Sequence, residues 1–242
     1  MGFEVSLLAA EKEADFSIHY LQKLDVFGHE VYITTTHIGL LMVSLVLIIF
    51  AVMVNKQLKK KSAEDTPGML QNIAELIVSM IDNMVHGIMG KESKRFRNYI
   101  CLIMMFVLLC NISGLFGLRA PTADYGVTLP LGLITFCMIH YNGVKKNKVG
   151  HFTALFKPSP ILFPINLIGE LAVPLSLSLR LFGNILSGTV MMGLIYGLLS
   201  PPITTGIPAV LHVYFDIFSG CIQAYVFSML TMVYINDKIA DE

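Results

Sequence analysis

The chain has 242 residues, of which 55% are hydrophobic and only 14% charged, and its mean hydropathy is +0.68. Because soluble domains carry about a quarter of charged residues, this composition excludes an ordinary soluble protein and indicates a polytopic membrane protein. The formal net charge is zero, which argues against a nucleic-acid partner.

The N-terminal segment, residues 1–34, is polar and acidic and precedes the first apolar run. That run, "IGLLMVSLVLIIFAVMV" at 38–54, contains no charge and predicts a spanning helix over 35–56. The sequence "NKQLKKK" follows it directly. Its lysines place this end of the helix in the cytoplasm by the positive-inside rule, so residues 1–34 are expected outside the cell.

The next segment, "TPGMLQNIAELIVSMIDNMVHGIMG", alternates between apolar and polar side chains with a helical period. It predicts an amphipathic helix over 66–90, with Thr66 as its N-cap. Such a helix suits the membrane surface or a site against other helices, because it is too polar to face lipid on all sides.

A helix hairpin is expected next. A basic stretch, "KESKRFR", precedes an outward spanning helix over 97–118, and a polar loop, "RAPTADYG", leads to a returning helix over 127–144 that ends at "KKNK". With this topology 13 of the 17 Lys and Arg residues lie on the cytoplasmic side and three lie outside. This bias supports an outside N-terminus and a cytoplasmic C-terminus.

Two long apolar segments, 161–200 and 205–236, complete a single membrane domain covering 1–242. The first would extend over about 60 Å as one helix, twice the roughly 30 Å of the hydrocarbon core. It must therefore break at a glycine (Gly183, Gly188 or Gly193) or lie steeply tilted. The predicted fold class is an all-α polytopic membrane protein whose last two helices are long and tilted.

Four ionisable residues interrupt these last apolar segments: Glu170, Arg180, His212 and Asp216. Such residues are costly in a membrane and usually functional. Arginine keeps its proton even when buried, so Arg180 is a fixed positive charge, while the carboxyl groups can carry protons. The pattern favours an ion path.

Two interpretations remain open for each of three polar residues, Arg180, His212 and Asp124. Arg180 could form a structural pair with Glu170 or Asp216. His212 could be an interfacial residue or a proton relay, and Asp124 could cap a helix or line an entry path. Catalytic motifs such as HExxH, GxSxG or a Walker loop do not occur in the sequence, so we expect no catalytic residue, no cofactor and no metal site.

Two blocks, "PINLIGELAVPLSLSLRLFGNILSG" and "FDIFSGCIQAYVFSMLTMVYI", closely resemble subunit a of the bacterial F-type ATP synthase, and "PTADYGVTLPLGL" resembles its outer loop and the following helix. The resemblance implies a non-catalytic stator subunit in the bacterial cell membrane. Its implied partners are the ring of c subunits, the peripheral-stalk subunit b, the rest of the complex and the lipid bilayer. Two half-channels would carry protons, or sodium ions, to and from the carboxylates of the ring.

The resemblance also implies roles for individual residues. Arg180 matches the essential arginine of the family, Asn184 the asparagine of the RLFGN motif, and Gln223 the glutamine across from the arginine. Two further positions match the paths. Glu170 falls where many members carry an acid on the cytoplasmic path, and Asn111 matches an asparagine near the outer path.

One position departs from the family pattern. Several members carry a glutamate nine residues after the arginine, where this chain has Thr189, and Asp216 falls where others have a histidine or glutamate. We therefore expect Asp216, with His212 nearby, to supply the outer path. The alternative functions are a secondary ion or solute transporter and an intramembrane enzyme in which Glu170 and Asp216 would meet beside Arg180.

Overall fold

The computed structural model describes residues 20–26, 29–60, 68–116, 119–148, 150, 153–156, 159–198 and 207–239. Within these ranges, five segments are long and apolar enough to cross a membrane: Thr35–Lys59, Met69–Phe116, Tyr125–Asn147, Pro160–Ile195 and Val210–Ile239. The prediction of a polytopic helical membrane protein is therefore confirmed.

A short β-hairpin precedes the helices and corrects the all-α prediction for residues 20–34. Strands β1 (Tyr20–Val26) and β2 (His29–Thr34) pair antiparallel, with Leu24 opposite Val31. The segment is rich in Tyr, Val, Ile and Thr, which favour strands. No turn signal in this segment is strong enough to predict the pairing from sequence.

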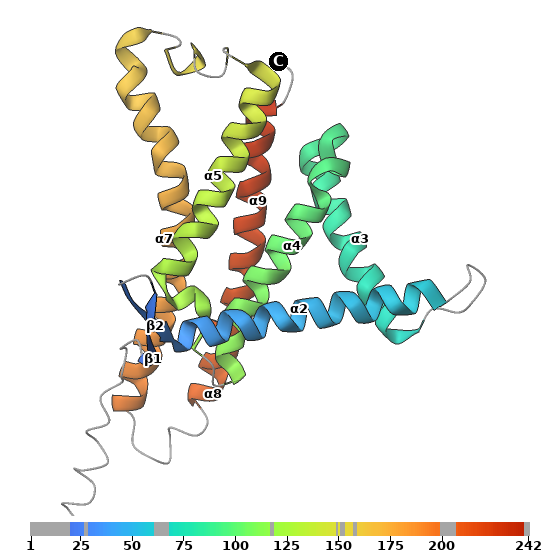
Figure 1. Cartoon of the computed structure of the whole chain (residues 1–242), viewed down its shortest axis with the longest axis vertical. Coiled ribbons are helices and arrows are strands. Elements are labelled where there is room, and N and C mark those ends of the chain that lie inside the picture. Colours follow the sequence, from blue (N-terminus) through green and yellow to red (C-terminus); the bar gives the residue numbers. More distant parts are fainter. Residues whose placement is uncertain are drawn as a thin grey trace, which may run out of the picture.

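The first spanning helix, α2 (Thr35–Lys60), follows β2 without a gap and runs across the other helices (Figure 1). Its 26 residues correspond to about 39 Å, enough for the hydrocarbon core. Most of its apolar side chains, among them Leu41 and Ile48, are exposed and suit contact with lipid. At its N-terminal end, a Cβ on Gly39 would lie 3.1 Å from the ring of Pro121, so the helix is anchored there.

Helices α3 (Met69–Met89) and α4 (Ser93–Ile112) pack as an antiparallel pair around the turn η1 (Gly90–Glu92). The predicted cap Thr66 lies outside the described residues. Helix α3 packs one face on α4 and on α9 (Ser219–Ile239). The buried residues on α3 are Ala74, Ile81, Val85 and Met89. The apolar side chains of Ile73 and Met80 are exposed.

The remaining helices form a layer in which α9 (Ser219–Ile239) lies between α4 and α5 (Tyr125–Asn147) (Figure 1). Helices α4 and α5 are the two arms of the predicted hairpin, and α9 packs against both of them. The turns η2 (Ser113–Phe116) and η3 (Pro121–Ala123) connect them. Two buried clusters hold this layer together. One joins Ile100, Ile139, Met232 and Ile235, and the other joins Val107, Leu177, Leu181 and Phe227.

Helix α7 (Phe163–Leu198) is continuous over 36 residues, so the predicted break at Gly183, Gly188 or Gly193 does not occur. It is preceded by the short turns η4 (Ala154–Phe156) and η5 (Pro160–Leu162). It packs closely on α5 at Gly132, where an added Cβ would lie 2.6 Å from the carbonyl oxygen of Pro174. Only a glycine permits this distance between the two backbones.

The segment before α9 also differs from the single helix expected over 205–236. A short helix, α8 (Ile207–His212), continues into a π-helical turn, η6 (Val213–Phe218), and then into α9. A π-helical turn holds one more residue per turn than an α-helix, and such turns often occur at functional sites. Hydrophobic periodicity does not reveal this extra residue, because all residues of η6 except Asp216 are apolar or aromatic and mark no single face.

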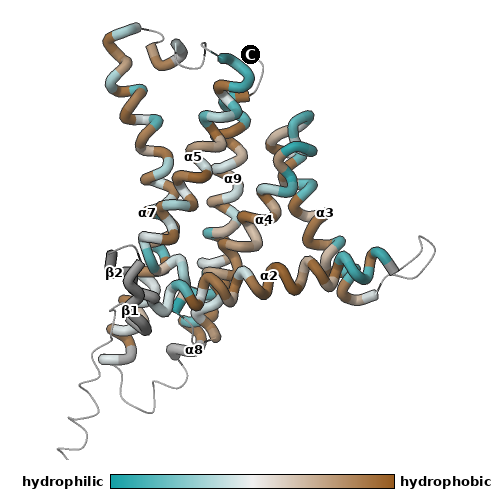
Figure 2. Tube along the Cα trace, in the orientation of Figure 1, coloured by the Kyte–Doolittle hydropathy of each residue, from teal (hydrophilic) through white to brown (hydrophobic). Residues whose placement is uncertain are grey.

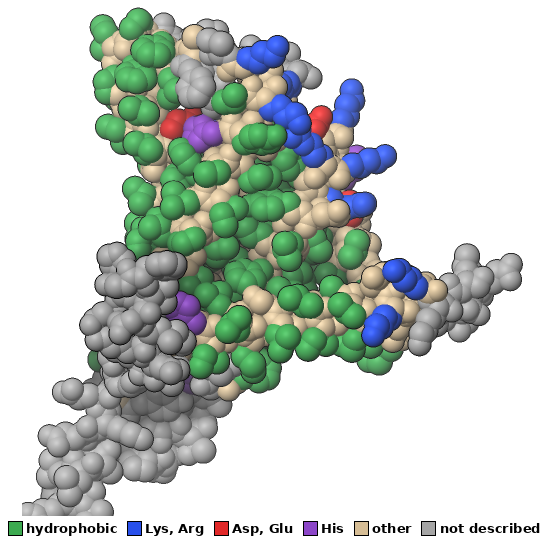
Figure 3. Space-filling model, in the orientation of Figure 1, with side chains coloured by type: hydrophobic (Ala, Val, Ile, Leu, Met, Phe, Trp, Pro, Cys, Tyr) green, Lys and Arg blue, Asp and Glu red, His purple; other side chains and the backbone are tan. Residues whose placement is uncertain are grey.

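Polar and basic residues gather on one side of the molecule. Figure 2 shows hydrophilic segments at the α3–α4 turn and at the C-terminal ends of α2 and α5, while the middle of each helix is hydrophobic. Figure 3 shows Lys and Arg side chains following the same edge. The exposed basic residues there are Lys56, Lys59, Lys91, Lys94, Arg95, Lys145, Lys146 and Lys148.

Candidate ion-translocation site

Arg180 lies on the side of α7 that faces away from the helix layer. Its neighbours Leu177 and Leu181 are buried against Ala224 and Phe227 of α9, whereas the Arg180 side chain is exposed. Among the described residues it has no hydrogen-bond or ion-pair partner. The alternative of a structural pair with Glu170 or Asp216 is therefore wrong, since both carboxylates have other partners.

Asn184, one helical turn after Arg180, links α7 to the start of α9. Its Oδ1 accepts a hydrogen bond from Ser219 Oγ at 3.0 Å, and its carbonyl accepts one from Ser187 Oγ at 2.9 Å. The asparagine therefore fixes the position of α7 relative to α9 close to the arginine.

Gln223 precedes Ala224, which packs on the leucines that flank Arg180. The side chain is 7% exposed, and its Nε2 has no hydrogen-bond partner within the described ranges. A buried donor without a partner costs about 1–3 kcal/mol. Several other buried polar side-chain atoms of the described residues also have no hydrogen-bond partner, so this feature is not specific to Gln223.

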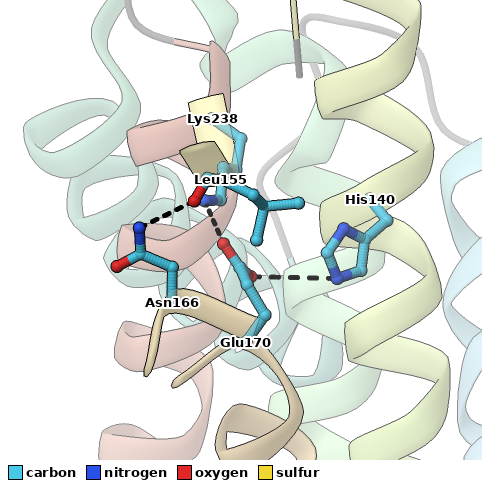
Figure 4. A network of polar contacts seen from close by, with 5 residues as sticks. All are labelled: His140, Leu155, Asn166, Glu170 and Lys238. Carbon is cyan, nitrogen blue, oxygen red and sulfur yellow. Dashed lines mark hydrogen bonds and ion pairs between the residues drawn. The ribbon is translucent and has the colours of Figure 1, made fainter. Parts of the chain in front are cut away.

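Glu170 lies on the wall of a cavity of about 560 Å³ between α5, α7 and α9. Its Oε1 is 2.5 Å from Lys238 Nζ, and its Oε2 is 3.8 Å from His140 Nε2 (Figure 4). Beside it, Asn166 Nδ2 donates to the carbonyl oxygen of Leu155 at 2.8 Å. Three helices thus bring one acid and two basic side chains together.

Asp216 and His212 form a second ionisable pair at the π-helical turn. Nδ1 of His212 is 2.7 Å from Oδ2 of Asp216. The side chain of His212 is 38% exposed and that of Asp216 is 23% exposed, so both can contact water or an ion. The structure therefore brings the two predicted outer-path residues into direct contact.

Helix α7 passes close to this pair. A Cβ on Gly188 would lie 3.6 Å from Cβ of Phe215, the residue before Asp216. Thr189 follows Gly188 and donates its hydroxyl to the carbonyl of Leu186 at 2.9 Å. The neighbours of Thr189 and Asp216, Gly188 and Phe215, thus meet between α7 and η6, although the Thr189 hydroxyl itself is not an acid.

Asn111 and Asp124 both have structural partners at the same end of the layer. Asn111 is 1% exposed, donates to the carbonyl of Gly220 at 3.2 Å and accepts from Thr122 Oγ1 at 2.8 Å. Asp124 is the N-cap of α5 and accepts from the backbone N–H of Gly126 at 2.9 Å. The capping alternative for Asp124 is confirmed.

Two residues of the Glu170 cluster were not among the predicted site residues. They are His140 of α5 and Lys238 of α9. Three different helices carry the cluster, so no spacing in the sequence could reveal it. Within the described part of the chain, no three His, Cys, Asp or Glu side chains lie close enough to hold a metal ion.

Comparison with known proteins decides the family. The family model described as "ATP synthase A chain" matches residues 37–236. The chain belongs to this family. It is 35% identical to "ATP synthase subunit a, sodium ion specific" of Propionigenium modestum, over 94% of this chain and 81% of that protein.

Two further relatives agree with this assignment. The chain is 34% identical to ATP synthase subunit a of Lysinibacillus sphaericus, over 86% of this chain and 92% of the relative. It is also 34% identical to ATP synthase subunit a of Bacillus pumilus, over 82% and 89%. As a member of the ATP synthase A chain family, the protein is a multi-pass subunit of the ATP synthase membrane sector.

The two alternative functions lose their support. The family match gives no basis for a secondary transporter. An intramembrane enzyme would need Glu170 and Asp216 to meet beside Arg180. The structure instead pairs Glu170 with Lys238 and Asp216 with His212.

Proposed function

We propose that this ATP synthase A chain is the ion-conducting stator subunit, with two half-channels that exchange protons or sodium ions with the carboxylates of a rotating c-ring. The observation that carries the proposal is the place of Arg180. It is an unpaired guanidinium, within the described residues, between two separately paired carboxylates. A fixed cation there blocks direct ion flow and attracts each ring carboxylate in turn.

Glu170 on α7 and Asp216 on η6 lie beside well-separated levels of α7. Glu170 precedes Arg180 by ten residues, or about 15 Å of helix, and Gly188, beside the Asp216 turn, follows it by eight, or about 12 Å. Glu170 belongs to the cytoplasmic path and Asp216, with His212, to the outer path. An ion can therefore pass from one path to the other only on a moving carboxylate.

The proposed arrangement in the membrane follows from helix length. Helix α7 has 36 residues, or about 54 Å, so it must tilt by more than about 50° to stay within a 30 Å hydrocarbon core. Its exposed apolar side chains on the Arg180 side form the surface against which the ring turns. These residues are Leu175, Leu179, Leu186, Val190, Met191 and Leu194.

The orientation follows from the basic edge. Lys and Arg gather at the ends of α2 and α5 and at the α3–α4 turn (Figure 3), so this side is cytoplasmic and the β-hairpin is outside. The b subunit of the peripheral stalk and the remaining subunits complete the complex.

The test is replacement of Arg180. We expect Arg180→Ala to abolish ATP-driven ion transport into inverted membrane vesicles while the assembled complex forms in normal yield. Both proton uptake and sodium uptake are measured, so that the result does not depend on the ion. Arg180→Lys is expected to fail as well, because a compact ammonium lacks the planar guanidinium fork and can lose its proton in an apolar site.

Leu45→Ala is the control, since Leu45 is an exposed apolar side chain of α2, outside the surface proposed for the ring. It should transport ions at nearly the wild-type rate. Coupled transport by the Arg180→Ala complex would overturn the proposed function.

A further inference from the structure

We propose that Lys238 is a positioning residue that competes with the transported cation for Glu170, and so controls when this carboxylate takes up and releases an ion. The inference rests on the proposed function, because that function makes Glu170 a group on the cytoplasmic path. It adds a residue near the C-terminal end of α9 to the ion path.

The contact is direct and lies on the cavity wall. Lys238 Nζ and Glu170 Oε1 are 2.5 Å apart, and the two side chains are 26% and 21% exposed. The ion pair can therefore exchange with water or a cation from the cavity. A pair at this distance neutralises the carboxylate as seen by any other cation.

Other charged groups around Glu170 come from each element packed against it. His140 of α5 approaches the second carboxylate oxygen at 3.8 Å. Helix α9 contributes Lys238 and also Asp237, which lines the cavity with Tyr234. Helix α7 and η4 contribute the uncharged contact between Asn166 and the Leu155 carbonyl (Figure 4). Lys238 is thus the one Lys or Arg side chain among the described residues that line this cavity.

A lysine suits a reversible competitor. Its ammonium is a point charge on a flexible four-carbon stem, so it can swing off Glu170 when a proton or sodium ion arrives and return when that ion leaves. While the pair is closed, the carboxylate is ionised but unavailable. The pair must therefore open once for each ion that passes Glu170.

The experiment measures how ion transport depends on the ion concentration on the cytoplasmic side. In inverted vesicles, ATP-driven transport is recorded over a range of external proton and sodium concentrations. We expect Lys238→Met to lower the half-saturating concentration of the transported ion by roughly tenfold, since a neighbouring cation changes the ion affinity of a carboxylate by at least that factor. The maximal rate should also fall, because release becomes slow.

Lys145→Met is the matched control. It removes one exposed positive charge at the end of α5, outside the residues that line the cavity, and should leave the half-saturating concentration within about twofold of wild type. A charge exchange tests the pair itself. Glu170→Lys and Lys238→Glu should each impair transport, and the double variant, which again holds one acid and one base, should recover the wild-type half-saturation.

An unchanged half-saturating concentration in an assembled Lys238→Met complex would overturn the inference, as would a double variant no better than its single parents. If Lys238→Met assembles poorly, Lys238→Arg decides, since it keeps the charge and should keep the half-saturation; a tenfold change there would also refute the role. Arg180→Ala separates the two proposals. If it still transports ions, the proposed function fails. If it does not, an unchanged Lys238→Met profile refutes only the role of Lys238.

Discussion

Side chains near the proposed outer ion path have different roles, and the extent of their burial distinguishes these roles. Asn111 matches a family position near the outer path, yet it is almost fully buried and uses its amide to hold Thr122 and the Gly220 carbonyl. Arg180 and Asp216 are partly open instead. We infer that Asn111 positions the start of α9 next to the path, whereas Asp216 exchanges ions.

Replacement of Asn111 should therefore destabilise the protein. Asn111→Leu leaves a buried hydroxyl and a carbonyl without their partner, at a cost of roughly 1–3 kcal/mol each. We expect a lower temperature of half-inactivation for the detergent-solubilised complex. Asn98→Leu, at an exposed position of the same helix, is the control and should change this temperature little. Equal stability of Asn111→Leu and wild type would show that the buried contacts do not matter.

The titratable pair at η6 gives a second prediction at this scale. Asp216→Asn keeps the shape and most hydrogen bonding of the side chain but cannot exchange a proton, so ion transport should fall severely. Thr189→Val should have little effect. Because Gly188 packs against Phe215, Asp216→Asn combined with Thr189→Glu returns an acid to the same region and should restore part of the rate. Wild-type transport by Asp216→Asn would assign the outer path to other groups.

Contacts between elements set where these residues stand. Helices α5 and α7 pack closely at Gly132 and Pro174, and Pro174 lies between Glu170 and Arg180 on α7. The π-helical turn η6 places Asp216 on the same side as His212, four residues earlier. Both features concern backbone geometry, so changes in the backbone should disturb the site even where no charged group is removed.

Gly132→Ala tests the crossing of α5 and α7. Alanine favours a helix by about 1 kcal/mol over glycine, but its Cβ would lie 2.6 Å from a backbone carbonyl that cannot move alone. We expect lower thermal stability and slower ion transport. Gly87→Ala on α3 is the control, because nothing lies within 4 Å of the added Cβ, and it should be neutral or slightly stabilising. The prediction fails if both variants behave alike.

In the whole molecule, the axes of the helices follow two main directions. Helix α2 runs across the layer formed by α4, α5, α7 and α9 (Figure 1). When α2 crosses the membrane, the long helices of this layer are strongly inclined to the membrane normal, as the length of α7 requires. The inclined layer then separates the Glu170 cavity from the Asp216 pair.

The orientation can be measured by labelling with an impermeant thiol reagent on intact cells, after Cys101, Cys110, Cys137 and Cys221 have been replaced by serine. Single cysteines at exposed positions report the side: Gly126→Cys should react, and Lys59→Cys and Lys148→Cys should not. In inverted vesicles the pattern should reverse. Labelling of Lys59→Cys on intact cells would contradict an outside N-terminus.

The helical membrane fold could be predicted from the amino-acid sequence, because long apolar runs and the distribution of Lys and Arg are compatible with few other folds in a bilayer. The sequence also determined Arg180, Glu170 and Asp216 as candidates, since an ionisable side chain in an apolar run is conspicuous without any knowledge of packing. Even the excessive length of residues 161–200 was evident, although not whether the helix breaks or continues.

The hydrogen-bond and ion-pair partners of these residues could be identified only in the tertiary structure. The pairs of Glu170 with Lys238 and His140 join α5, α7 and α9, and the placement of α9 between the two helices of the hairpin, α4 and α5, was not predicted. Contacts between helices distant in the chain depend on which small residues let backbones approach, as Gly132 does at Pro174. A periodic pattern records which face of a helix is apolar, but not which neighbour that face meets.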